Sequence, residues 1–265
     1  MSSNIHSSAV VEDGARLGEG VKIGPFCHVG KDVVLGDDVE LKSHVVVAGN
    51  TSVGARTRIF PFASIGHEPQ DLKYHGEPNS LEIGTDCLIR EHVTMNPGTE
   101  GDASRTAIGN RCVFLAGAHV AHDCILGNNI IFSNNVMVAG HCKVDDNVII
   151  GGGAGVHQFC RIGRNAFVGG MAGLENDVIP FGMALGNRAY LGGLNLIGMK
   201  RAGVSRESIH NARHAFKELF SSDIPLKEAA VALGEKFGDD PVVSQILVFL
   251  KESGDRSICT PRREG

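Results

Sequence analysis

Apolar residues recur at every sixth position along most of the N-terminal two thirds of the chain. The first run contains Ile5, Val11, Leu17, Ile23, Val29, Leu35, Leu41, Val47, Val53, Ile59 and Ile65. The pattern returns at Ile83 and Ile89, and again at every sixth position from Ile108 to Leu174. Neither an amphipathic helix nor an ordinary strand has this period. The sequence therefore predicts a solenoid of hexapeptide repeats, that is, a β-helix.

Small or β-branched residues occupy a second regular position, four residues after each apolar one. They include Ala9, Ala15, Val21, Cys27, Val33, Val39, Val45, Thr51, Thr57 and Ala63. Each hexapeptide unit then forms a short strand and a turn, and both positions point into a narrow core where side chains stack from coil to coil. Three hexapeptide units make one coil, so equivalent positions in neighbouring coils are three units apart. Successive coils are expected to lie about 4.8 Å apart.

Polar residues interrupt the repeat between residues 65 and 83, where the segment GHEPQDLKYHGEPNS contains Gly and Pro. Loops that leave a rigid scaffold often carry binding groups. Four candidates for contact with a ligand lie in this loop: Gln70, Asp71, Lys73 and Tyr74. A solvated Ω-loop is the alternative. A second break, over residues 96–105, shifts the frame by one residue, and we expect little chemistry from it.

After Pro180 the apolar residues follow the helical period of 3.6 instead. Three helices are predicted, beginning after the capping or turn residues Ser205, Pro225 and Pro241. We therefore expect a β-helix domain over residues 1–190 and a helical domain over residues 191–265. The helical bundle is expected to cap the open end of the solenoid, whose strand edges would otherwise be unpaired.

The composition argues against several classes of partner. Of the 265 residues, 42% are hydrophobic, and the formal net charge is -5 without a basic or acidic block. This charge pattern disfavours nucleic acid and membrane surfaces as partners. The N-terminus lacks the pattern of a signal peptide, and no apolar stretch approaches the roughly 18 residues of a membrane span. We therefore expect a cytoplasmic protein without stable membrane insertion.

Six of the seven cysteines fall at the small inward position: Cys27, Cys87, Cys112, Cys124, Cys142 and Cys160. Buried thiols in apolar surroundings behave as small hydrophobes and are unreactive. The sequence therefore predicts that these cysteines fill the core and form neither a metal site nor a disulfide framework. Cys259, in a polar tail, indicates nothing about function.

Four histidines form a cluster by coil arithmetic: His119, His122, His141 and His157. None falls at an inward position, and outward histidines suit two chemistries. They can hold zinc with an open coordination position, or one of them can act as a general base on an attacking hydroxyl. Asp123 favours the second, because a carboxylate next to His122 can orient its ring and stabilise the imidazolium that forms.

Five segments carry a resemblance to a known family: ASIGHEPQDLKYHGEP, AHVAHDC, AGH, GVHQFCRIG and GLNLIGMKRAGVSRESI. Together they resemble the acyl-carrier-protein-dependent UDP-N-acetylglucosamine O-acyltransferases, which catalyse the first step of lipid A synthesis. The hexapeptide repeat alone is shared by many acyltransferases, whereas the combination with QDLKY, HDC, VHQF and the helical tail is specific. The resemblance covers nearly the whole chain.

The resemblance implies a left-handed parallel β-helix that forms a homotrimer with active sites in clefts between subunits. It implies direct transfer of a 3-hydroxyacyl chain from acyl carrier protein to the 3-hydroxyl of UDP-N-acetylglucosamine, without a metal or other cofactor. Carried over by position, His122 is the general base, Asp123 its orienting partner, and the Gly140 amide stabilises the oxyanion. A 3-amino analogue of the sugar would suit a histidine base equally.

Further positions are implied to bind the substrates. Those for the sugar and diphosphate are Asp71, Lys73, His119 and His141, and those for the nucleotide or cleft are His157, Gln158, Asn195 and Arg201. Gln70 is a further candidate for substrate binding. Gly170 leaves room for the acyl tail. Candidate contacts for the acidic carrier protein are Lys200, Arg201, Arg206, Arg213 and Lys217. The sequence departs from the better-known members at Ile197, Ala202 and Arg188, which replace an acidic residue, a basic residue and a histidine.

Two other functions remain open from the sequence. One is a non-catalytic β-helix scaffold, for which the repeat alone would suffice, without outward histidines or loops. The other is a zinc-dependent hydratase of similar fold, which would contain stoichiometric zinc.

Overall fold

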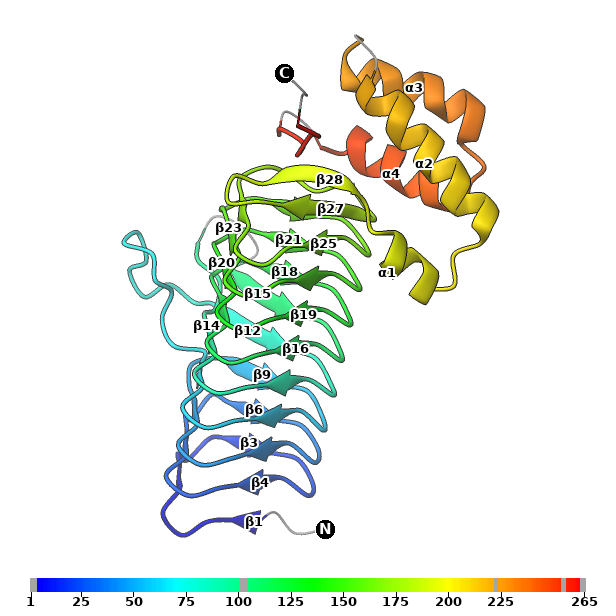
Figure 1. Ribbon diagram of the computed structural model, residues 1–265. Helices are drawn as coiled ribbons and strands as arrows, with labels where there is room; N and C mark the ends of the chain where they lie inside the picture. Colours follow the sequence, from blue (N-terminus) through cyan, green and yellow to red (C-terminus); the bar gives the residue numbers. More distant parts are fainter. Residues whose placement is uncertain (1–3, 101–103, 222–223, 254–255, 263–265) are drawn as a thin grey trace.

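The computed structural model describes residues 4–100, 104–221, 224–253 and 256–262. Over these residues the chain forms a parallel β-solenoid with helices at its C-terminal end (Figure 1). The predicted fold class, mainly β with hexapeptide repeats and a C-terminal helical part, is confirmed.

Each coil contributes strands to three sheets, named A, B and C here. Sheet A contains β1 (Asn4–Ile5), β4 (Lys22–Ile23), β7 (Glu40–Leu41), β10 (Arg58–Ile59), β13 (Leu88–Ile89), β16 (Val113–Phe114), β19 (Ile131–Phe132), β22 (Ile149–Ile150), β25 (Phe167–Val168), β27 (Gly182–Leu185) and β28 (Tyr190–Leu194). Sheet B contains β2 (Val10–Val11), β5 (His28–Val29), β8 (Val46–Val47), β11 (Ser64–Ile65), β14 (Thr94–Met95), β17 (His119–Val120), β20 (Met137–Val138), β23 (Gly155–Val156) and β26 (Gly173–Leu174). Sheet C contains β3 (Arg16–Leu17), β6 (Val34–Leu35), β9 (Thr51–Val53), β12 (Ser80–Ile83), β15 (Arg105–Ile108), β18 (Ile125–Leu126), β21 (Lys143–Val144) and β24 (Arg161–Ile162).

Strand pairing confirms the predicted coil length. Asn4 pairs with Lys22, which lies three hexapeptide units further along the chain, and most later pairs keep this spacing. Two steps are longer than three units, because Arg58 pairs with Leu88 and Leu88 pairs with Val113. These two steps contain the predicted breaks. Each excursion therefore leaves the solenoid and returns in register.

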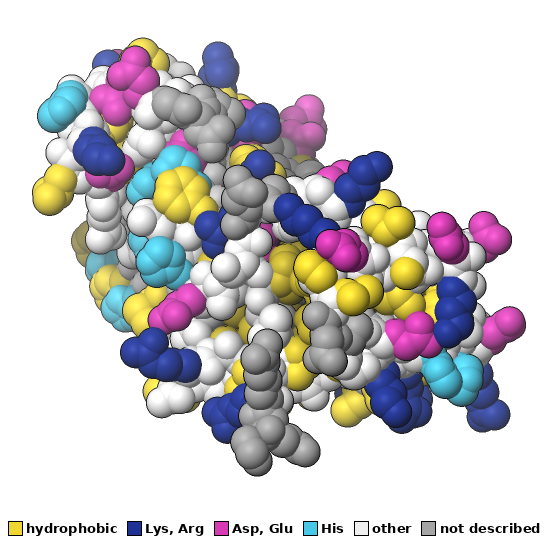
Figure 2. All heavy atoms as spheres, turned by 90° about the horizontal axis from the view of Figure 1, so that it is seen from above, with side chains coloured by type: hydrophobic (Ala, Val, Ile, Leu, Met, Phe, Trp, Pro, Cys, Tyr) yellow, Lys and Arg dark blue, Asp and Glu magenta, His cyan; other side chains and the backbone are white. Residues whose placement is uncertain are grey.

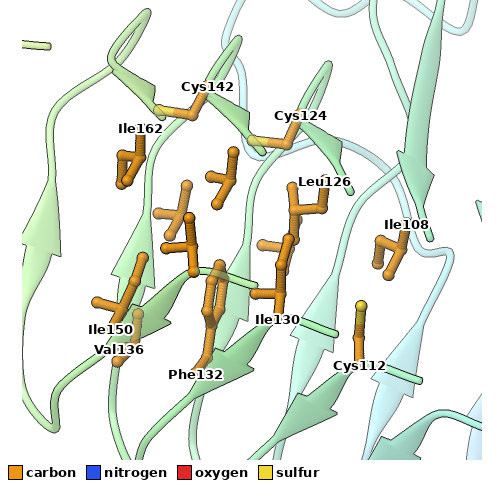
Figure 3. Close-up of a cluster of buried hydrophobic side chains, with 14 of the residues drawn as sticks. Ile108, Cys112, Cys124, Leu126, Ile130, Phe132, Val136, Cys142, Ile150 and Ile162 are labelled. Carbon is orange, nitrogen blue, oxygen red and sulfur yellow. The ribbon is translucent and has the colours of Figure 1, made fainter. Parts of the chain in front are cut away.

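The positions predicted to point inward form one continuous core. From Val21 to Leu174, both the six-residue repeat positions and the small positions four residues later are buried. Figure 3 shows such side chains stacked from coil to coil, with Cys124 and Cys142 among them. All seven cysteines are free and buried. Cys259 is one of them, which the polar sequence around it does not indicate.

Helices α2 (Arg206–Ser221), α3 (Leu226–Phe237) and α4 (Pro241–Lys251) match the three helices predicted from the sequence. The Ser205 hydroxyl accepts a hydrogen bond from the Ser208 amide at 3.0 Å, and Asp240 caps α4 through its carboxylate. No helix in the described segments is both long enough and apolar enough to cross a bilayer.

A further short helix, α1 (Leu196–Arg201), is not indicated by the sequence pattern. Asn195 caps it by accepting a hydrogen bond from the Gly198 amide at 2.9 Å, and it donates to the Asn165 carbonyl at 3.1 Å. Asn195 therefore fastens α1 to the solenoid.

The C-terminal end of the solenoid is closed by β28 and by the tail of the chain. β28 runs antiparallel to β27, and the Leu191 amide in β28 donates to the Thr260 carbonyl at 2.9 Å. Asp177 forms an isolated bridge with Ile258. Helices α2 to α4 lie beside this end (Figure 1). The last strand edges are thus covered by β28 and the tail of the chain, in addition to the helical bundle that the sequence predicts.

Asp177 joins the tail to the solenoid through a buried charge. Its fully buried carboxylate accepts hydrogen bonds from the Arg161 amide and from Arg256 Nε, both at 2.9 Å, and lies 3.2 Å from Arg161 Nε. The Arg161 guanidinium donates in turn to the Phe249 and Glu252 carbonyls at the end of α4. One carboxylate therefore connects sheet C, the tail and helix α4.

Replacing Asp177 with Asn should destabilise the fold, because two arginines would lose their common carboxylate. Hydrogen bonds to charged groups contribute roughly 1.5–3 kcal/mol each, so the thermal midpoint should fall clearly. Asp86→Asn is the matched control, since the ion pair of Asp86 with Arg56 is exposed and such pairs contribute little. Circular dichroism measures both midpoints, and an equal change in the two variants would contradict this role of Asp177.

Candidate active site

His122 and Asp123 form a hydrogen-bonded pair on the turn between β17 and β18. His122 Nδ1 lies 2.8 Å from Asp123 Oδ2. The Asp123 side chain is 1% exposed and the imidazole of His122 is 12% exposed. A carboxylate at Nδ1 favours the tautomer with the proton on Nδ1, which leaves a lone pair on Nε2. The pair can therefore accept a proton at Nε2.

Corner positions align the groups of neighbouring coils. Asp123, His141 and Phe159 follow one another at intervals of one coil, and their φ values are 58°, 60° and 67°. These left-handed conformations belong to the tight turns between strands, so the three side chains project from one corner. The His122 and His141 ring centroids are 5.1 Å apart, and His141 stacks on Phe159 at 4.6 Å.

Thr99 holds the Asp123 carboxylate from the second excursion. Its amide donates to both carboxylate oxygens at 3.0 Å, and its hydroxyl donates to Oδ2 at 2.6 Å. The expectation that residues 96–105 offer little chemistry was therefore wrong. Thr99 belongs to no recognisable sequence motif. Only the structure shows that this excursion returns next to the coil that contains Asp123.

Gly140 lies against the His122 ring. A Cβ atom on Gly140 would lie 2.5 Å from His122 Cε1 and 2.7 Å from Nε2, so any side chain here would overlap the imidazole. The Gly140 carbonyl accepts a hydrogen bond from the Phe159 amide at 3.0 Å. The Gly140 N–H makes no hydrogen bond to any residue that the structure describes. The Gly140 N–H is thus not used within the described part of the chain.

His119 lies on β17, where its Nδ1 is 2.7 Å from Thr94 Oγ1. Burial lowers the pKa of His119 from its ordinary value of 6.5, and the nearby His122 lowers this pKa further. His119 is therefore neutral at neutral pH. It can offer a hydrogen bond to a ligand but not a positive charge.

Three side chains of this corner have the chemistry and the spacing of metal ligands. One ligand atom each from His122, Asp123 and His141 lies within 4.8 Å of the other two. His141 Nε2 is 3.9 Å from Asp123 Oδ2, and the His141 side chain is 20% exposed.

A cavity of about 720 Å³ opens in front of the pair, over the outer face of sheet B. Of the residues predicted to act in the site, it brings together Gln70, His119, His122, Gly140, His157 and Gln158. Met137, Gly155 and Gly173 continue its wall along the solenoid, away from His122. The cavity therefore combines polar side chains along its length with a largely apolar floor.

The first excursion, in cyan in Figure 1, projects from the solenoid. Asn96 fixes its base by donating to two carbonyls of the loop at 3.1 Å. Asp71 Oδ2 lies 4.0 Å from His122 Nε2. The loop therefore reaches over the site. The side chains of Lys73 and Leu72 are exposed, and Leu72 is 100% exposed.

Apart from residues of the His122 corner and of the first excursion, three predicted site residues lie outside this cavity. Asn195 and Arg201 line a separate cavity of about 670 Å³, formed by sheet A and α1, together with Ile197 and Ala202. Gly170 is exposed at a different corner of the solenoid. Within one chain, these residues are therefore not brought to His122.

The basic residues expected to contact the carrier protein lie on α1 and α2. All five are exposed: Lys200, Arg201, Arg206, Arg213 and Lys217. Figure 2 shows Lys and Arg side chains in dark blue on the helical side of the molecule, at the right of the view. Arg188, outside the helices, lies 3.6 Å from Glu175 in an exposed ion pair.

Two family models match the chain. The model for UDP N-acetylglucosamine O-acyltransferase, domain 2, matches residues 177–259. The model for six bacterial transferase hexapeptide repeats matches residues 14–49.

Known proteins resemble the chain over nearly its whole length. A relative from Methylobacterium radiotolerans, named acyl-(acyl-carrier-protein)–UDP-N-acetylglucosamine O-acyltransferase, is 65% identical and covers 97% of this chain and 95% of its own. A relative of the same name from Brucella ovis is 49% identical, with coverage of 97% and 92%. The solved structure of LpxA from Acinetobacter baumannii is 40% identical with a TM-score of 0.93, over 97% of this chain and 99% of that one.

His119 should titrate below pH 6.5, because burial disfavours its charged form. Hydrogen–deuterium exchange at the imidazole carbon, followed by mass spectrometry across a pH series, measures this midpoint. Since the unfolded chain binds the proton more readily, His119 should lower the stability of the fold as the pH falls through the unfolded pKa. A midpoint at or above 6.5 would contradict the assignment of a neutral ring.

Proposed function

The chain belongs to the family of acyl-(acyl-carrier-protein)–UDP-N-acetylglucosamine O-acyltransferases, and we propose a mechanism for it in which His122 is the general base. The enzyme transfers an acyl chain from acyl carrier protein to UDP-N-acetylglucosamine in the synthesis of lipid A. We propose further that a 3-hydroxyacyl chain moves to the 3-hydroxyl of the sugar, and that this takes place in the cytoplasm.

The observation that carries the mechanism is the contact of 2.8 Å between His122 Nδ1 and Asp123. In the proposed step, His122 Nε2 takes the proton of the sugar hydroxyl as that oxygen attacks the thioester carbon. Asp123 stabilises the imidazolium, and Thr99 keeps the carboxylate in place. When the tetrahedral intermediate collapses, the C–S bond breaks and the imidazolium returns the proton to the leaving thiolate.

Gly140 is proposed to stabilise the oxyanion that forms on the thioester carbon. Gly140 lies against the His122 ring, and its N–H is not used by any described residue. A backbone N–H at this place is fixed before the reaction starts, so it requires no reorganisation as the charge develops. The absence of a side chain is what allows both the amide and the imidazole to approach one substrate.

The end of the cavity around His119 and His122 is proposed to hold the sugar and the diphosphate. His119 is neutral and can hydrogen-bond a sugar hydroxyl, as can Gln70 and His141 at the cavity wall or corner. Asp71, at 4.0 Å from His122 Nε2, can orient the acceptor at the base. The exposed Lys73 is in the same loop and suits the negative charge of the diphosphate.

The nucleotide and the acyl tail are proposed to extend beyond this chain's own cavity. His157 and Gln158 lie in the cavity of His122, whereas Asn195 and Arg201 line a different one. Contacts from all four to one ligand would therefore require two copies of the chain. Gly170, which lacks a side chain and is exposed, is proposed to border the acyl tail.

The carrier protein is proposed to dock on the basic residues of α1 and α2. Lys200, Arg206, Arg213 and Lys217 are all exposed at this end of the molecule. An acidic partner would be attracted to such a surface at long range, and its binding would weaken as salt increases.

The outer face of sheet A supports a homotrimer. Its first strands carry polar outward residues, but the next six strands carry Leu88, Val113, Ile131, Ile149, Phe167 and Met183. A row of apolar side chains over six coils on a solvent-facing sheet is typical of a surface covered by a partner. We propose that a second copy covers this row and that the fully exposed Leu72 belongs to the same contact.

The transfer itself is proposed to need no metal or other cofactor. Proton transfer and oxyanion stabilisation are both supplied by residues of the chain, and acyl carrier protein brings the activated acyl group. Membership of an enzyme family disfavours the scaffold alternative. Stoichiometric zinc whose removal by a chelator abolishes the activity would favour the zinc-dependent alternative instead.

His122→Ala should lower turnover by roughly 10² to 10⁴, the usual contribution of a general base. The binding of UDP-N-acetylglucosamine should change little, because the base acts mainly in the transition state. Steady-state kinetics with acyl carrier protein thioester and calorimetric binding measure the two quantities. His28→Ala is the matched control, since His28 is also an outward histidine of sheet B but lies far from the cavity. Unchanged turnover in His122→Ala, with assembly intact, would overturn the assignment.

Ile131→Lys should disrupt the trimer, because it places a charge in the apolar row of sheet A. Light scattering of the purified variant should give the mass of a monomer, while the unmodified chain gives that of three copies. Val10→Lys is the control, because Val10 is also an exposed apolar strand residue but lies on sheet B. A trimer of undiminished stability in Ile131→Lys would show that the interface lies elsewhere.

A further inference from the structure

We propose that His122, Asp123 and His141 form an inhibitory site for a first-row divalent metal ion, with Zn²⁺ as the preferred ion. The inference goes beyond the proposed acyl transfer, whose steps are assigned to residues of the chain. It concerns what the same three side chains can bind when the cavity contains no substrate.

The spacing of the three residues is close to that of a metal site. With metal–ligand bonds of about 2.0–2.1 Å, two ligand atoms of a tetrahedral site lie about 3.3 Å apart. The separation of His122 Nδ1 and Asp123 Oδ2 is 2.8 Å, and that of Asp123 Oδ2 and His141 Nε2 is 3.9 Å. The two distances lie on either side of the required value. Changes of about 0.5–0.6 Å in these two separations, and a closer approach of the His122 and His141 ligand atoms from within 4.8 Å, would therefore complete three corners of a tetrahedron.

The donor set and its surroundings also suit such an ion. Two imidazoles and one carboxylate are an established ligand combination for zinc with an open fourth position. A tetrahedral site of imidazole and carboxylate ligands is the geometry that zinc adopts in proteins, which favours Zn²⁺ here. Thr99 fixes the carboxylate with its amide and hydroxyl, as outer partners of metal ligands do. The three side chains are 1%, 12% and 20% exposed, so water competes only weakly for them.

A metal ion bound at this site would prevent His122 from acting as a general base, because it changes the tautomer of the imidazole. In the active pair, His122 has its proton on Nδ1 and a lone pair on Nε2. A metal bound at Nδ1 takes the place of that proton, and the neutral imidazole then has its proton on Nε2. Nε2 can no longer accept a proton from the sugar hydroxyl. Inhibition therefore follows from the position of the ion and requires no change in the fold.

Metal binding by another histidine pair must be distinguished from binding at this site in any experiment. His210 and His214 are exposed on α2, four residues apart, with ring centroids 4.4 Å from each other. Such a pair on a helix can also chelate a metal ion. It lies outside the proposed catalytic cavity, so its removal provides a matched control for metal binding.

Co²⁺ provides the direct test, because its visible absorption reports the number and type of its ligands. Chain without a histidine tag, treated with chelator, is titrated with Co²⁺ and then with Zn²⁺. One variant is His141→Asn, since asparagine accepts the positive φ of this corner. The control is the double variant His210→Gln/His214→Gln. Circular dichroism and light scattering establish that each variant is folded and assembled.

We expect stoichiometric Co²⁺ bands of a low-coordinate site in the unmodified chain and in the control, and their loss on addition of Zn²⁺. His141→Asn should weaken the apparent affinity by at least about tenfold, as loss of a metal-site partner does. Loss of the bands only in the control, or their absence from the unmodified chain, would overturn the proposal.

Transfer kinetics provide the second readout. Zn²⁺ should inhibit the unmodified chain, excess chelator should restore it, and His141→Asn should require at least about tenfold more Zn²⁺ for the same fractional inhibition of its own activity. Transfer that is indifferent to Zn²⁺ despite binding would refute the inhibitory role. Because Co²⁺ binding is measured without substrates, a failure of the metal site and a failure of the transfer mechanism can be distinguished.

Discussion

Stacked inward side chains hold neighbouring coils in a register of three hexapeptide units, and the functional groups inherit their positions from it. A single strand of two residues has almost no stability alone, so each coil depends on the coils above and below it. The buried residues from Val21 to Leu174 supply this dependence over most of the solenoid. Side chains at equivalent corners are consequently placed one above another with little freedom, and a catalytic arrangement can be built from residues far apart in sequence.

The proposed site uses that rigidity in two ways. The corner turns place Asp123 and His141 in line, while His122, one residue earlier, turns its ring towards both. The next turn brings Gly140 so close to the imidazole that only a residue without Cβ fits. The excursions then return in register and add what a bare solenoid lacks, an aspartate from one loop and a threonine from the other. Orientation of a base by fixed partners is the kind of preorganisation that accelerates proton transfer.

The fold and the centre of the site could be predicted from the sequence because both follow from a short period. The inward positions, the coil length, helices α2 to α4 and the proximity of His122 to His141 all came from counting residues. Thr99 could not be found in this way, because its role depends on where a frame-shifting excursion returns. The cap formed by Asn195 and the burial of Cys259 in the tail depend on contacts that have no periodic signal.

The mechanism depends on His122 Nε2 as the acceptor of the proton from the attacking hydroxyl, and chemical rescue measures this role. In a variant without the imidazole, the cavity of about 720 Å³ should admit free imidazole to the vacated place. Turnover of His122→Gly should therefore rise with the concentration of added imidazole. Among substituted imidazoles of similar size, the rescue should also increase with the pKa of the added base. A variant that binds both substrates but is rescued by none of these bases would contradict this role of His122.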